Sequence, residues 1–129
     1  MRPRDRPGSG RPDELRHPRV GCGHTLRCDG HLLRLLGEGT PFVSGIDTPE
    51  LRTQKCQKER KLAHLARMRL KDLVTGRTVK IVAQGRDDTP KHRPLVNIYL
   101  SDGREVGKIL LKEGFARPWR PHEHVDWCD

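Results

Sequence analysis

The sequence predicts an α+β protein, a small β-barrel with helices packed against it. Five short segments have the composition of strands, a long amphipathic pattern follows the third of them, and a shorter helical pattern follows the fifth. Five short strands with a helix inserted after the third suit a five-stranded barrel of the OB type.

The first strand-like segments lie between residues 20 and 46, where short apolar runs alternate with turn signals. "LRCDGHLLRLL" predicts a hairpin, because Asp29 and Gly30 can adopt the positive φ angles of a tight two-residue turn. "LLGEGTPFV" offers a second turn at residues 37–40. A third strand is expected to end at "GID".

A long helix is predicted over residues 57–74. Its apolar residues fall within about 140° of arc at about 100° per residue, which is the pattern of an amphipathic helix. Gly76 is expected to end the helix, because glycine readily adopts the left-handed conformation found after a helix C-terminus. The residues of this apolar face are Leu62, Leu65, Ala66, Leu70 and Leu73.

Two further strands and a second helix follow. "TVKIVA" and "LVNIYL" are rich in β-branched and aromatic residues, and the polar, basic stretch between them predicts an exposed loop. Asp102 and Gly103 form another turn. Val106, Ile109 and Leu110 then have helical spacing, and Gly114 ends this second, shorter helix.

Residues 1–19 contain six arginines and four prolines and almost no large apolar side chain. This composition predicts a disordered basic tail, which serves as a linker or as an arm that attracts phosphates. Residues 20–129 then form one domain.

The chain has 129 residues and carries 26 Lys and Arg against 17 Asp and Glu, a formal charge of +9. This excess favours polyanionic partners such as nucleic acid over cationic ones, although a solvated basic surface is the simpler alternative. No apolar run approaches the roughly 20 residues that span a bilayer, and no export signal is visible. We expect a cytoplasmic protein that does not enter a membrane, or a secreted or periplasmic one if a precursor carries a signal.

The four cysteines, Cys22, Cys28, Cys56 and Cys128, contain no C-x-x-C pair, which argues against a structural zinc site. Their even number permits two disulfides, but a reducing cytosol would keep them as thiols.

The stretch "SGIDTPELRTQKC" places Asp47, Pro49 and Glu50 together at a strand end, just before the long helix. Aspartate and proline favour turns on backbone grounds alone, so an ordinary acidic turn is one interpretation. The other is a pair of carboxylates that hold a metal ion and activate a water molecule.

Several motifs together resemble the staphylococcal nuclease-like, or thermonuclease, family. They are "GIDTPE", the helix after it, a "GRD" loop with a following arginine, "YLSDGREVGKILLKEGFARPW" and the terminal "WC". The match covers roughly residues 20–128. The resemblance implies an OB barrel that hydrolyses phosphodiester bonds of DNA and RNA, usually with calcium. We expect the protein to be a monomer.

By this resemblance, Asp47 is a metal ligand, Thr48 lends its backbone carbonyl, and Glu50 positions or deprotonates the attacking water. Arg93 matches the loop arginine that contacts the reacting phosphate, to which a guanidinium fits better than an ammonium. Arg86 and Lys91, in the same basic loop, are expected to bind nucleic acid.

The family's Asp-Gly-Asp-Thr near the first strand is incomplete here, and two alignments compete for its place. The gap-free alignment keeps Asp29, which we expect as a further metal ligand, but puts His31 at the liganding aspartate and Phe42 at the first catalytic arginine. The upstream alignment puts His24 at the aspartate and Arg34 at the arginine, and requires an insertion of about eight residues.

Either alignment replaces one carboxylate by histidine, which is a poor ligand for Ca²⁺ and a good one for softer ions such as Mn²⁺. The resemblance therefore implies a nuclease with Ca²⁺, or with Mn²⁺ or another divalent metal. A catalytically degenerate OB module that binds nucleic acid or protein is the alternative, and a structural part of a larger assembly is a third.

Two further expectations concern the end of the chain. In the family, "KC" and "WC" positions such as those of Cys56 and Cys128 often occur together, so the resemblance implies that these two cysteines can bridge. Trp119 and Trp127 are expected to pack in the core or against the tail rather than to stack on bases.

Overall fold

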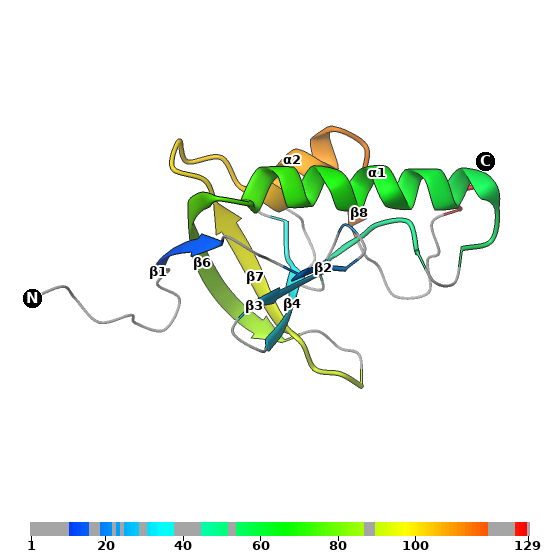
Figure 1. Ribbon diagram of the computed structural model, residues 1–129. Helices are drawn as coiled ribbons and strands as arrows, with labels where there is room; N and C mark the ends of the chain where they lie inside the picture. The colour runs from blue at the N-terminus through cyan, green and yellow to red at the C-terminus, as the bar shows by residue number, and fades with distance from the viewer. Residues whose placement is uncertain are drawn as a thin grey trace, which may run out of the picture.

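The computed structural model describes residues 11–15, 19–21, 23, 25–28, 31–37, 45–51, 54–86, 90–118 and 126–128. It contains a six-stranded mixed sheet, a two-stranded sheet and two helices (Figure 1). The helices are α1 (Gln57–Val74) and α2 (Val106–Lys112). The strands are β1 (Arg11–Leu15), β2 (Arg19–Val20), β3 (Thr25–Cys28), β4 (His31–Leu35), β5 (Ile46–Asp47), β6 (Arg77–Arg86), β7 (Pro94–Tyr99) and β8 (Arg117–Pro118).

The larger sheet has the strand order β1-β6-β7-β4-β3-β2, and the smaller one pairs β5 with β8. All pairs are antiparallel except β4 and β7, which run parallel. Figure 1 shows α1 lying along one side of this sheet with α2 next to it. The expected α+β class is therefore observed, with a mixed sheet and two helices.

Closure into a five-stranded barrel is not confirmed. Within the described residues the edge strands β1 and β2 do not pair with each other, so the six-stranded sheet stays open. The third expected strand is represented by the short β5, which pairs with β8 instead of joining the larger sheet. Residues 38–44, which precede β5, lie outside the described part of the chain.

The N-terminal segment differs from the sequence prediction, which placed residues 11–15 in a disordered tail. These residues form β1, which pairs with β6 from Arg11 opposite Ile81 to Leu15 opposite Arg77. Strand pairing uses backbone groups that any composition provides, and the long β6 offers a free edge on the side away from β7. An edge strand also tolerates Pro12, which lacks an N–H group.

The apolar core lies between α1 and the sheet. α1 buries Ala63, Ala66, Leu70 and Leu73 on one face, and its span coincides with the predicted helix. Leu65, which the spacing assigned to the buried face, is 51% exposed and marks the limit of that face. The helix ends as expected, with the Thr75 N–H donating to the Lys71 carbonyl and Gly76 at φ 69°.

Glu105 joins β7 to α2. Its side chain is 2% exposed, and its carboxylate accepts hydrogen bonds from the N–H groups of Ile98, Gly107 and Lys108 at 2.9, 3.0 and 2.9 Å. A carboxylate at a helix N-terminus is stabilised by these N–H donors and by the helix dipole. This contact therefore fixes the start of α2 against the central strand of the sheet.

A second ionic contact joins the two helices. The Arg69 guanidinium of α1 donates Nε and Nη2 to the two carboxylate oxygens of Glu113, just after α2, at 2.8 and 2.9 Å. Both side chains are about one third exposed, so the pair contributes little to stability. Among the described residues no helix has the length and apolar character needed to cross a membrane.

Glu105 and Glu113 are expected to contribute differently to the stability of the fold. Replacing Glu105 with Gln leaves a buried amide that cannot accept all three N–H groups, so we expect a loss of about 2–3 kcal/mol in the free energy of unfolding. Replacing Glu113 with Gln should cost less than about 1 kcal/mol, because that pair is exposed. Urea denaturation of both variants measures the difference, and equal losses would contradict the proposed importance of burial.

Candidate active site

The predicted acidic turn lies between β5 and α1. Ile46 and Thr48 are fully buried and anchor the turn, whereas the carboxylates of Asp47 and Glu50 are half-buried. The short pairing of β5 with β8 places Asp47 opposite Arg117, whose guanidinium lies over the ring of Trp127 at 5.6 Å from its centroid. The buried neighbours of Asp47 therefore hold the turn in place, and the two carboxylates stay partly exposed to solvent.

Arg34 reaches this turn from β4. The residue is 3% exposed, and its Nη2 donates a hydrogen bond to the Ile46 carbonyl at 3.3 Å. Gly45 makes room for it, because a Cβ atom there would lie 2.8 Å from the Arg34 Nε, and the backbone of Gly45 has a φ of +92°. A buried guanidinium thus lies next to the residue that precedes Asp47.

The upstream alignment agrees with this arrangement. A Cβ atom on Gly23 would lie 2.8 Å from the Cβ of Ala66 and 3.2 Å from the Thr48 methyl, so Gly23 packs between α1 and the acidic turn. Gly23 and Arg34, which that alignment preserves, therefore both contact the turn. His24, Asp29 and Phe42 lie outside the described residues, and His31 is the first residue of β4.

The negative charge of the Asp47 carboxylate is only partly neutralised by its surroundings. Burial, followed by the nearby charge of Glu50, raises its pKa from the ordinary 3.8 to about 6. The positive charge of Arg34 and a hydrogen bond from the Thr48 backbone lower the pKa by less, and Glu59 raises it slightly further. The turn therefore holds more negative charge than Arg34 neutralises.

This charge imbalance fits a hard divalent cation. Two carboxylates and a backbone carbonyl are oxygen donors of the kind that Ca²⁺ and Mg²⁺ prefer, with water or phosphate oxygens completing the coordination. Within the described part of the chain, no group of three His, Cys, Asp or Glu residues is placed to hold a metal ion. A cation at this turn would therefore have two carboxylate donors from the described residues, Asp47 and Glu50.

Arg93 directly precedes β7, the strand that pairs with β4. It is half-buried, and in β7 Leu95 pairs with Arg34 across the parallel ladder. The loop before it is shaped by Arg86, whose Nη1 donates to the His92 carbonyl at 2.9 Å, and by the positive φ of 45° at His92. Arg86, which the sequence placed in the loop, is instead the last residue of β6 and pairs with Pro94, because β6 extends further than the predicted strand. Lys91 is exposed as expected.

Sequence reasoning missed Glu59. This α1 residue is 5% exposed, and its carboxylate accepts hydrogen bonds from the N–H groups of Lys55 at 2.7 Å and Glu50 at 3.2 Å. The signal was available, because a glutamate three residues after a helix N-cap typically reaches back to N–H groups before the helix. Here the N-cap residue is Cys56.

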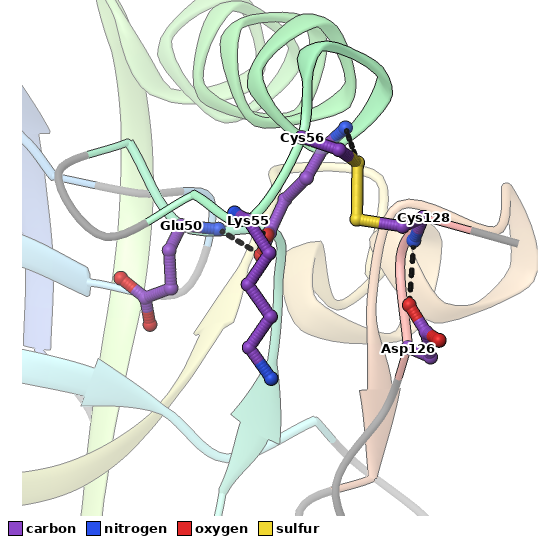
Figure 2. Close-up of a disulfide and its surroundings, with 6 residues drawn as sticks. Glu50, Lys55, Cys56, Asp126 and Cys128 are labelled. Atoms are coloured by element: carbon purple, nitrogen blue, oxygen red, sulfur yellow. Dashed lines mark hydrogen bonds between the residues drawn. A yellow bond between two sulfur atoms is a disulfide. The ribbon is translucent and has the colours of Figure 1, made fainter.

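The disulfide implied by the family resemblance is confirmed. Cys56 is bonded to Cys128 with their Cα atoms 6.1 Å apart, and the bond fastens the C-terminal segment to the start of α1 (Figure 2). Figure 2 also shows the Glu50 side chain pointing away from this disulfide. Trp127 is 8% exposed and packs as expected, whereas Trp119 lies outside the described residues.

Comparison with known families agrees with this geometry. Residues 42–126, well over half of the chain, match the family model described as staphylococcal nuclease homologue, and the chain belongs to this family. No curated protein matches the chain at a significant level. A domain of this family suggests a nuclease or a nucleic-acid-binding module.

The raised pKa of Asp47 predicts a pH-dependent stability. A carboxyl group whose pKa is about 6 when folded and 3.8 when unfolded binds its proton more tightly in the folded state. The contribution of Asp47 to the free energy of unfolding is therefore largest below pH 3.8 and is lost as the pH rises through 6. The ionised group thus costs up to about 3 kcal/mol at pH 7.

We therefore expect Asp47→Asn to raise the free energy of unfolding by about 1–3 kcal/mol at pH 7 in EDTA, and the gain to vanish below pH 4. Thermal melting across this pH range measures it. Asp102→Asn is the control of opposite sign, because hydrogen bonds from the Arg104 backbone and side chain lower the pKa of Asp102. If Asp47→Asn is less stable than the unmutated protein at pH 7, the Asp47 carboxylate is stabilised by its surroundings.

Proposed function

We propose that this protein is a metal-dependent nuclease that hydrolyses phosphodiester bonds of DNA or RNA. The observation that carries the proposal is the buried guanidinium of Arg34 beside the paired carboxylates of Asp47 and Glu50. A binding module alone would use Arg34 only to tie β4 to β5, whereas a nuclease also needs a positive charge beside the acidic turn to stabilise the reacting phosphate.

Each group has a task in phosphodiester hydrolysis. Glu50 accepts the proton of the attacking water as the new bond to phosphorus forms, and the departing ester oxygen takes up a proton from solvent water as the old bond breaks. Arg34 and Arg93 donate hydrogen bonds to the phosphate oxygens, which gain negative charge in the transition state. Asp47 and the Thr48 carbonyl would hold the cation.

When bound, the divalent ion would supply positive charge for the phosphate oxygens and lower the repulsion between them and the acidic turn. Ca²⁺ is the proposed cofactor, with Mn²⁺ or another divalent ion if His24 takes the place of the missing aspartate. Asp29 stays a candidate ligand from the sequence alone. The Cys56–Cys128 disulfide favours the secreted or periplasmic location over the cytoplasm.

The exposed cations support a nucleic-acid partner. Along α1, four basic or titratable side chains recur at spacings of three and four residues and fall within roughly 60° of arc. All four are exposed, so they can contact phosphates without losing a buried environment. They are Arg60, His64, Arg67 and Lys71. We propose that this stripe, together with Arg86 and Lys91, attracts the substrate to a monomeric enzyme.

A cleavage assay tests the proposal. Single-stranded DNA and RNA should be cut in Ca²⁺ or Mn²⁺, and EDTA should stop the reaction. Glu50→Gln keeps the shape of the side chain and removes the base, so turnover should fall by about 10²-fold or more. Binding of the same oligonucleotide should persist and should weaken with added salt, because it depends on lysine and arginine.

Glu113→Gln is a matched control, since it changes a glutamate that pairs with Arg69 away from the acidic turn. Its turnover should equal that of the unmutated protein. If the protein binds oligonucleotides in a salt-dependent way and cuts none with Ca²⁺, Mn²⁺, Mg²⁺ or Zn²⁺, the nuclease proposal is wrong. The catalytically degenerate module would then be the better description.

A gain-of-function variant tests the missing ligand. His24→Asp restores the carboxylate of the family pattern in the upstream alignment, so Ca²⁺-dependent cleavage should rise by about tenfold or more relative to Mn²⁺-dependent cleavage. His31→Asp is the matched control for the gap-free alignment. A rise in Ca²⁺ preference with His31→Asp alone would favour that alignment instead.

A further inference from the structure

The Glu59 carboxylate holds both ends of the loop that carries Glu50. One oxygen accepts the Lys55 N–H at 2.7 Å and the other accepts the Glu50 N–H at 3.2 Å, so a single buried side chain spans residues 50–55. The Glu50 backbone is thereby tied to the first turn of α1. The negative charge of the Glu50 carboxylate raises the pKa of Asp47.

The same turn of α1 is tied to the disulfide. The Glu59 N–H donates to the Sγ atom of Cys56 at 3.3 Å, and that sulfur is bonded to Cys128 at a separation of 72 residues. The C-terminal segment is itself anchored by the buried Trp127 and by the Arg117 guanidinium over its ring. A continuous series of contacts therefore connects the disulfide, Glu59 and the backbone of Glu50.

We propose that Glu59 is a positioning residue for Glu50, and that the Cys56–Cys128 disulfide maintains this position, so that reduction of the bond lowers turnover. The inference rests on the proposed nuclease function. Reduction by a dithiol transfers two electrons and two protons, yields two cysteine thiols and converts the dithiol to its disulfide. The reduced Cys56 is then released from the C-terminal segment.

The simpler interpretation is that Glu59 only stabilises the N-terminus of α1. A glutamate at this helix position in that role alone would bond the N–H of the N-cap residue, which here is Cys56. Glu59 instead bonds the N–H groups of Lys55 and Glu50, which both precede the N-cap, and Glu50 is the proposed base. Displacement of a catalytic group by about 1 Å can cost about 10²-fold in rate, so this bond has a catalytic consequence.

The test compares Glu59→Gln and Cys128→Ser with the control Glu113→Gln. Glutamine keeps the length of the side chain but presents an NH₂ group to one of the two N–H donors. We expect both test variants to lose about 10- to 100-fold in kcat, with unchanged affinity for a single-stranded oligonucleotide, at a temperature where melting curves show all variants folded. A general loss of structure would weaken binding as well.

Dithiothreitol provides the redox arm. It should lower kcat of the unmutated protein to that of Cys128→Ser and should have no effect on Cys128→Ser itself. If dithiothreitol inhibits both equally, another cysteine is responsible and the proposed role of this disulfide is wrong. Glu59→Gln with unchanged kcat would overturn the positioning role.

Amide hydrogen exchange separates this inference from the proposed function. In the unmutated oxidised protein the N–H groups of Glu50 and Lys55 should exchange slowly, and Glu59→Gln should accelerate both by about tenfold or more. Reduction should have the same effect on Glu50. Absence of cleavage under all metals would refute the nuclease proposal, whereas unchanged exchange at Glu50 in Glu59→Gln and in the reduced protein would refute the positioning role.

Discussion

Burial of charged side chains at the junctions between elements is the constraint on which the rest of this structure depends. Arg34, Glu59 and Glu105 are each 5% exposed or less. A buried charge is stabilised by hydrogen bonds, and each of these side chains bonds a backbone group of a neighbouring element, although the Nε atom of Arg34 makes no hydrogen bond within the described residues. Arg34 therefore ties β4 to β5, Glu59 ties the acidic turn to α1, and Glu105 ties β7 to α2. These contacts add specific geometry to the apolar packing of the core.

The acidic turn shows the opposite balance. Asp47 is held in a half-buried position next to Glu50, where the ionised carboxylate destabilises the folded protein. Sites that bind cations or activate water commonly retain such an unfavourable charge, because the ligand or substrate compensates for it. The surrounding contacts of Arg34 and Glu59 keep the turn in place despite this cost. Stability and proposed function thus compete at the same two side chains.

Membership in the staphylococcal nuclease homologue family and the geometry of the turn support each other. Membership in the family does not decide whether this domain cuts nucleic acid or only binds it, because function depends on the residues of the site. In this chain the buried Arg34 lies beside the acidic turn, which supports the nuclease proposal. The disulfide connects this turn, through Glu59, to the C-terminal segment.

The sequence by itself determined the helices and the acidic turn, because helical periodicity and turn residues act over a few neighbours. The span of α1 and the position of Asp47 and Glu50 followed from such local patterns. The sequence motifs resembled the family that the comparison with family models showed. Only the tertiary structure decided the pairing of β1 with β6, the exposure of Leu65 and the choice of Arg34 as the arginine beside the turn. Strand pairing and burial depend on contacts between residues far apart in the chain, and a local sequence pattern cannot predict which of these contacts form. Glu59 was visible as a helix-capping glutamate, but its bond to Glu50 required the folded loop.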